Sequence, residues 1–210
     1  ASPVPYHDAN NGAPNLLWQS EGDWKFREVT TEVGLNQNNL RFSLASVWDD
    51  FDNDGDLDLY VANDFGRNNL YRNDESAQGD ARWFVDIAAA AAVEDIGPGM
   101  SAACGDVDND GLIDIYVSNM FSSAGNRITH QSQFKPGAAR DDIKGFQRHA
   151  RGNSLFINQG DGTFADRAFE SQTFLGRWAW GSLFADLNND GWRDIYVANG
   201  FVTADNNNDL

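Results

Sequence analysis

The sequence predicts an all-β fold assembled from about three repeated units of roughly four strands each. The first observation is composition: 20 Gly, 5 Pro and 12% aromatic residues are typical of short strands joined by tight turns. The second is an acidic segment that recurs three times, and the third is a strand-like run after each copy. With 210 residues and 41% hydrophobic content, the chain has enough apolar material for one sizeable core.

The acidic segment follows the pattern D-x-[DN]-N-D-G-x-x-D-[LI]-Y-V-[AS]-N. It occupies residues 50–63, 106–119 and 186–199, and agreement over fourteen positions in three copies excludes coincidence. The second half of each copy, such as residues 57–61, is a nearly continuous run of aliphatic and aromatic residues. This run predicts a strand that is buried on both faces between neighbours. We expect it to be the final strand of its unit.

A second element precedes each acidic segment. Residues 68–73 match residues 153–158 in an N-x-L-[YF]-x-N pattern, and residues 15–20 are a weaker copy. A turn with the sequence G-D-G follows at residues 160–162. Each unit then consists of this N-x-L-aromatic strand, a turn, further strands, the acidic loop and a final strand. A length of about 50 to 60 residues, insertions apart, suits a β-propeller blade.

The predicted units span approximately residues 14–67, 68–152 and 153–210. Together they make residues 1–210 a partial β-propeller, which we expect to be part of a larger propeller. The second unit is longer because residues 121–152 form an insertion unlike the repeat.

The insertion is the best candidate for a partner site, because long loops on a rigid scaffold commonly carry binding. The alternative is a solvated loop whose basic residues neutralise nearby acidic surface. The insertion contains six of the fifteen basic residues: Arg127, Lys135, Arg140, Lys144, Arg148 and Arg151.

The acidic loops predict three calcium sites. Calcium takes about 6 to 8 oxygen ligands in flexible geometry, and each loop offers side-chain oxygens at positions 1, 3, 5 and 9 and a backbone carbonyl at position 7. Glycine at position 6 permits the sharp reversal between the two halves of the loop. The predicted ligands are Asp50, Asp52, Asp54, Asp56 (carbonyl) and Asp58; Asp106, Asp108, Asp110, Leu112 (carbonyl) and Asp114; and Asp186, Asn188, Asp190, Trp192 (carbonyl) and Asp194.

Two comparisons support calcium over other interpretations of these loops. Carboxylates this close together repel one another unless a cation lies among them, and ordinary solvated turns do not need that arrangement. An EF-hand requires Glu at position 12 and flanking helices, whereas position 12 is Val61, Val117 or Val197 within a predicted strand. Because Asn188 is neutral, we expect the third loop to bind calcium more weakly than the other two.

With these motifs the chain resembles the FG-GAP/VCBS repeats of integrin-α-like β-propellers. The N-x-L-[YF]-x-N and G-D-G-T-F motifs, with residues 148–153 and 180–182, are similar to the cartilage acidic protein-like subgroup, and the resemblance covers roughly residues 14–202. It implies structural calcium loops in a secreted or cell-surface protein that binds other molecules. Propellers of this kind have about seven blades, so the resemblance also implies assembly with further blades or subunits.

The charge balance excludes one class of partner. The chain has 32 acidic and 15 basic residues and a net charge of −17, so it repels phosphates and we expect no nucleic-acid partner. It contains no run of about 18 apolar residues, so we expect no membrane span. The single cysteine, Cys104, aligns with Trp48 and Phe184, which favours a buried side chain over a reactive thiol.

Three functional hypotheses follow. The first is a non-catalytic binding or assembly module, in which calcium fixes the loops and the insertion 121–152 contacts a protein or glycan partner. The second is an enzyme that acts on polysaccharide or phosphoester with a site outside the loops, for example a carboxylate pair. The third is a purely structural subunit of a surface complex. We expect the first, with no catalytic residue, and an extracellular, cell-surface or periplasmic location, because free calcium in the cytosol is low.

Overall fold

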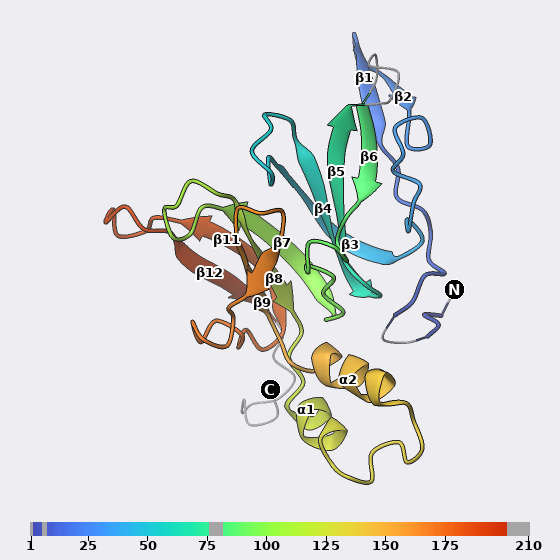
Figure 1. Cartoon of the computed structure of the whole chain (residues 1–210), viewed down its shortest axis with the longest axis vertical. Helices are drawn as coiled ribbons and strands as arrows, with labels where there is room; N and C mark the ends of the chain where they lie inside the picture. Colours follow the sequence, from blue (N-terminus) through green and yellow to red (C-terminus); the bar gives the residue numbers. More distant parts are fainter. Residues whose placement is uncertain (1, 6–7, 76–81, 201–210) are drawn as a thin grey trace.

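In the computed structural model, which describes residues 2–5, 8–75 and 82–200, antiparallel strands dominate the chain (Figure 1). This confirms the predicted all-β fold. Residues 201–210 of the third predicted unit lie outside the described residues. Two sheets have four strands each: β3 (Phe42–Asp49), β4 (Asp58–Phe65), β5 (Asn69–Glu75) and β6 (Arg82–Asp86) form the first, and β7 (Gly99–Gly105), β8 (Asp114–Asn119), β9 (Ser154–Asn158) and β10 (Phe164–Asp166) form the second.

Two further sheets have two strands each within the described residues. One pairs β1 (Trp18–Gly22) with β2 (Lys25–Glu28), and the other pairs β11 (Ala179–Ala185) with β12 (Asp194–Asn199). The repeat motifs show which strands these are. β1 carries the weaker N-x-L copy and corresponds to β5 and β9, whereas β12 follows the third acidic loop and corresponds to β4 and β8.

The order of strands within each sheet corrects one expectation. β3 and β7 are edge strands, and the acidic loop joins each of them to its neighbour, β4 or β8. The strand after the loop is therefore the second of its sheet and not the final one. Periodicity gives the length of a repeat but not its starting point. Residues 68 and 153, at which the second and third units were predicted to begin, fall inside the two complete sheets.

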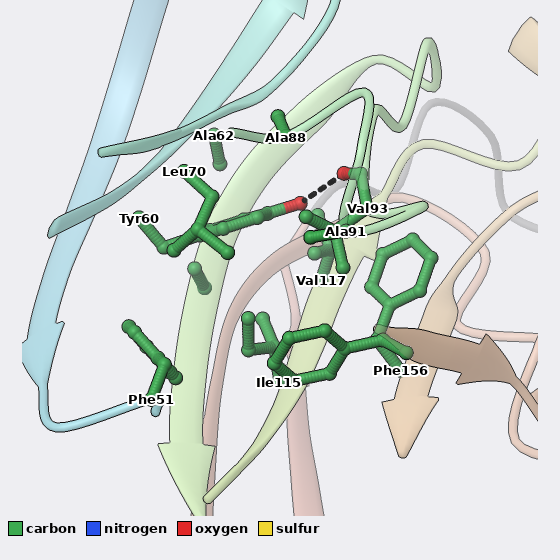
Figure 2. Packing of buried hydrophobic residues seen from close by; sticks show 12 residues of the cluster. Phe51, Tyr60, Ala62, Leu70, Ala88, Ala91, Val93, Ile115, Val117 and Phe156 are labelled. Carbon is green, nitrogen blue, oxygen red and sulfur yellow. Dashed lines mark hydrogen bonds between the residues drawn. The ribbon is translucent and has the colours of Figure 1, made fainter. Parts of the chain in front are cut away.

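Successive sheets stand side by side through their first strands. β7 contacts β3 of the preceding sheet and β11 of the following one, which is the arrangement of β-propeller blades (Figure 1). Figure 2 shows the apolar core between the first two sheets, where Tyr60 and Leu70 pack with Ile115, Val117 and Phe156. The hydroxyl of Tyr60 donates to a backbone carbonyl at a distance of 3.2 Å, so its one polar atom is satisfied within this core.

The strands that follow the acidic loops differ in burial. Every residue of β8 and the first six residues of β4 are buried, as expected for strands packed between neighbours. β12 has the same sequence pattern but contains no buried residue. The difference follows from the sheet, because β12 pairs only with β11 in the described part of the chain.

The insertion folds as two helices, which the sequence patterns did not predict. α1 (Ser123–Thr129) and α2 (Arg140–His149) contact each other and lie below the sheets in Figure 1. Ser122 caps α1 by accepting a hydrogen bond from the backbone N–H of Gly125. Neither helix of the described residues has the length and apolar character that crossing a membrane requires.

A buried ion pair attaches the end of α2 to the second sheet. The guanidinium of Arg148 lies 2.5 Å from Asp95, whose side chain is fully buried. Asp95 also accepts hydrogen bonds from Ser154 at 2.5 Å and from Asn119 at 2.9 Å. Arg151 forms a second ion pair with the sheet. Two of the six basic residues of the insertion therefore neutralise acidic groups of the scaffold, but one of these groups, Asp95, is buried and is not part of an acidic surface.

Candidate metal centre

The three acidic loops share one backbone conformation. Position 4 has a left-handed φ of 59°, 59° and 60°, and the glycine at position 6 has φ of 93°, 86° and 89°. Asn and Gly are the residues that adopt this region most readily, which explains their presence in all three copies. The residues are Asn53, Asn109 and Asn189 at position 4 and Gly55, Gly111 and Gly191 at position 6.

The aspartate at position 1 organises each loop. One carboxylate oxygen of Asp50 accepts from the N–H of Asp54 at 3.1 Å, and the other accepts from the N–H of Gly55 at 2.9 Å. Asp106 and Asp186 make the same pair of bonds in their loops, at 2.9 to 3.1 Å. The chain is therefore wrapped around this carboxylate in all three loops.

Positions 1, 3 and 9 come together in the first two loops. One carboxylate oxygen from each of Asp50, Asp52 and Asp58 lies within 4.8 Å of the other two, and the same holds in the second loop. Oxygens that bind one calcium ion at about 2.3 to 2.6 Å are at most about 5 Å apart. Each group therefore has a spacing that can hold a metal ion. The second group consists of Asp106, Asp108 and Asp114.

The aspartate at position 9 is the buried member of each group. Asp58 is 2% exposed and Asp114 is 0% exposed. The two oxygens of Asp58 accept hydrogen bonds from the backbone N–H groups of Phe51, at 3.1 Å, and Asn73, at 2.8 Å. Burial raises the pKa of Asp58 and of Asp114 to about 6. A bound cation would offset the cost of burying these charges.

Like charges crowd the first two loops more than the third. Burial, together with the charges of Asp54 and Asp50, raises the pKa of Asp52. In the third loop the pKa of Asp190 is lowered by the backbone N–H of Trp192 and by the amide of Asn188. The amide in place of a carboxylate thus relieves the repulsion that a cation would otherwise relieve.

The remaining predicted ligands lie at the edge of these groups. Asp54 and Asp110 at position 5 are not in the groups of three, and one oxygen of each accepts from the N–H of position 7, at 2.9 and 2.8 Å. Their second oxygen is not used in that bond. In the third loop only Asp186 and Asp194 are acids at positions 1, 3 and 9, so no group of three acids forms there among the described residues.

Sequence reasoning missed a contact between neighbouring loops. The side-chain amide of Asn53 donates to the carbonyl of Gly111 in the second loop at 3.4 Å, and Asn109 donates to the carbonyl of Gly191 in the third loop at 3.0 Å. The first loop is thereby linked to the second, and the second to the third. The signal was present in the sequence, since position 4 is Asn in every copy.

Sequence reasoning also missed that the last Asn of the N-x-L-[YF]-x-N motif supports the site. Besides donating its backbone N–H to Asp58, Asn73 donates its side-chain amide to the carbonyl of Leu57 at 3.0 Å. Asn158 makes the equivalent bonds to Asp114, at 2.9 Å, and to the carbonyl of Ile113, at 3.2 Å. The third strand therefore holds the position-9 aspartate in place.

Comparison with known proteins agrees with this geometry. The FG-GAP-like repeat family matches residues 50–117 and 140–197, which include all three acidic loops. Cartilage acidic protein 1 of Xenopus tropicalis is 26% identical over 194 residues. The match covers 91% of this chain but only 26% of that relative, so the chain spans about a quarter of its length. Together with the propeller-like sheets, the family match shows that the chain belongs to the FG-GAP-like repeat family.

Proposed function

We propose that the chain is a non-catalytic module of an extracellular or cell-surface protein, in which calcium holds the acidic loops and the propeller presents a surface to a protein or glycan partner. The observation that carries the proposal is the convergence of three carboxylates in each of the first two loops, one of them buried. All the donors are oxygens, which hard cations such as calcium prefer.

The side chains at positions 1, 3, 5 and 9 and the carbonyl at position 7 would hold one ion per loop. The ion would supply positive charge where carboxylates repel, and it would connect the first and second strands of a sheet. The third loop, with Asn188, would bind more weakly. This ligand set is the one that the sequence predicts.

The location of the insertion supports a separate role for it. The second acidic loop enters β8 at Asp114, and the insertion leaves β8 after Asn119, so the two lie at opposite ends of that strand. In the proposed module the metal ions stabilise one side of the propeller, and the helical insertion contacts the partner on the other side. The family match and the relative named for cartilage favour an extracellular setting.

The enzymatic alternative has less support. A pocket of about 410 Å³ lies on the face of the first sheet, and no Asp or Glu lines it. A carboxylate pair of the glycosidase type would need two acids across such a cleft. Among the described residues, the groups of three acids whose oxygens converge are those of the first two loops.

Thermal unfolding tests the calcium proposal. Excess chelator should lower the melting temperature markedly, and calcium should restore it better than magnesium, because the loops offer flexible oxygen ligands. Asp54→Ala and Asp110→Ala should each reproduce part of the loss. The matched control is Asp142→Ala on the exposed start of α2, which should leave the response to calcium unchanged. Identical melting curves with and without chelator would refute the proposal.

A further inference from the structure

Asn158, the last residue of β9, contacts the acidic loops of two different sheets. Its side-chain amide donates to the carbonyl of Phe51, at position 2 of the first loop, at a distance of 2.8 Å. The same amide donates to the carbonyl of Ile113, at position 8 of the second loop, at 3.2 Å. Asn158 is 4% exposed, so both bonds lie inside the protein. A single side chain of the second sheet therefore joins the two loops.

Phe51 connects this contact to the metal group of the first loop. It lies between Asp50 and Asp52, two of the three acids whose carboxylates converge there. Its own backbone N–H donates to Asp58, the third of these acids, at 3.1 Å. Its side chain packs in the core between the first two sheets (Figure 2). The bond from Asn158 therefore fixes the stretch of backbone that carries the acids of the first loop.

These bonds form a continuous path between the two buried position-9 aspartates. Asp58 accepts from the N–H of Phe51, and the carbonyl of Phe51 accepts from the side chain of Asn158. The backbone N–H of Asn158 in turn donates to Asp114 at 2.9 Å. All four residues are buried, and hydrogen bonds away from water hold their partners more firmly than exposed ones do. The positions of both aspartates thus depend on the same asparagine.

The equivalent residue of the first sheet, Asn73, supports one loop. Its backbone N–H donates to Asp58, and its side-chain amide donates to the carbonyl of Leu57, at position 8 of the first loop. Among the described residues, its amide makes no hydrogen bond to another loop. Asn73 and Asn158 therefore differ in one respect, which is the bond that Asn158 makes across to the neighbouring sheet.

We propose that Asn158 is a positioning residue for two calcium sites, its own in the second loop and that of the first loop. The inference rests on the proposed calcium function. Ion binding costs less ordering free energy when the ligands are already fixed, so a bond that holds Phe51 favours binding at the first loop. Loss of the amide should therefore weaken both sites, although Asn158 lies in neither loop.

Asn158→Ser removes the amide and keeps the local turn. The side-chain oxygen of Asn158 accepts from the N–H of Gly160 at 3.0 Å, and a serine oxygen can also accept this bond. Serine has no amide to donate to the carbonyls of the two loops. Asn73→Ser is the matched control, because it removes an amide that supports the first loop alone.

NMR spectroscopy can follow the loops separately during a titration of the metal-free chain with calcium chloride. The N–H groups of Gly55, Gly111 and Gly191 each donate to the position-1 aspartate of their own loop, so their resonances report the first, second and third loops. In Asn158→Ser, the calcium concentration at half-saturation should rise about tenfold at both Gly55 and Gly111, as is typical when a group that orients a metal ligand is lost. In Asn73→Ser it should rise at Gly55 alone.

The third loop controls for loss of folded protein. Partial unfolding would change the titration of Gly191 as well, whereas we expect Gly191 to titrate as in the wild type in both variants. A residue that only stabilises the second sheet would affect Gly111 alone, and that result for Asn158→Ser would overturn the proposal. If neither Gly55 nor Gly111 of the wild-type chain responds to calcium, the calcium function on which the proposal rests is overturned instead.

A second measurement leaves Asn158 unchanged and so does not depend on the folding of its variant. Asp108→Asn removes an exposed acid from the second metal group, so the first loop should fill at lower calcium than the second. The side-chain amide resonance of Asn158 should then change together with Gly55, because the amide is bonded to Phe51. An amide resonance that stays constant while Gly55 responds would overturn the proposal.

Discussion

The second and third acidic loops have nearly the same sequence but different surroundings. Asp114 in the second loop is fully buried and accepts hydrogen bonds from its own loop and from Asn158 of the third strand. Asp194 in the third loop is only partly buried and accepts from Leu187 of its own loop. The backbone of the two loops is the same, with φ of 86° and 89° at the central glycine.

The comparison teaches that the loop sequence determines the shape of the site, whereas the sheet determines its environment. A loop can wrap correctly on its first and second strands alone. Only a third strand buries the position-9 aspartate and supplies its second hydrogen-bond donor. We therefore expect the metal sites to differ in strength more than their sequences suggest.

Removal of the position-9 aspartate should cause the largest difference in lost stability between the second and third loops. Asp114→Ala leaves two backbone N–H groups of the second sheet without their acceptor, which should cost about 2 to 5 kcal/mol of unfolding free energy. Asp194→Ala should cost much less, because that side chain is partly exposed and accepts one bond from its loop. Urea unfolding in the presence of calcium measures both. Equal losses would contradict the role assigned to the third strand.

Acidic pH should weaken the contact between α2 and the second sheet by protonating Asp95. Burial alone would raise the pKa of Asp95, but the charge of Arg148 and the hydrogen bonds from Ser154 and Asn119 hold it below its ordinary value. A lowered pKa in the folded state contributes stability that is fully present above the unfolded pKa and is lost as pH falls through the folded pKa. Hydrogen exchange of α2 should therefore accelerate at strongly acidic pH. Asp95→Asn should remove this acid-dependent step; the same step in the variant would contradict the assignment.

The smallest expected effect is that of Asn188→Asp. The added carboxylate gives the third loop the same acids as the second and should tighten its calcium binding, since the charge of the ligands tunes affinity. The third site should still remain weaker than the second in the monomeric chain, because its sheet is incomplete in the described residues. Calorimetric titration of the variant measures this. A third site as tight as the second would show that ligand charge alone accounts for the difference.

Much of this organisation is present in the sequence. The loop pattern predicted the acidic turns and the strand after each one. Cys104 is only partly buried, and this burial raises the pKa of its thiol to about 12, which fits the prediction of an unreactive side chain. The sequence could not show at which strand each sheet begins, because the length of the repeat is the same whichever strand is counted first. Exposure of Trp18 and Tyr196 could not be predicted either, since it depends on which neighbouring strands are present.

The insertion shows a second limit of sequence reasoning. Its basic residues suggested a binding surface, but Arg148 and Arg151 form ion pairs with Asp95 and Asp166 of the scaffold. Those partners are distant in sequence, and only the fold brings them beside α2. Charge composition predicts that ion pairs will form without showing which residues form them.

Equilibrium dialysis of metal-free protein against buffered calcium counts the bound ions. We expect two ions per chain that bind at low free calcium and a third that binds only at higher free calcium. The absence of bound calcium, or three ions of equal affinity in the monomeric chain, would contradict it.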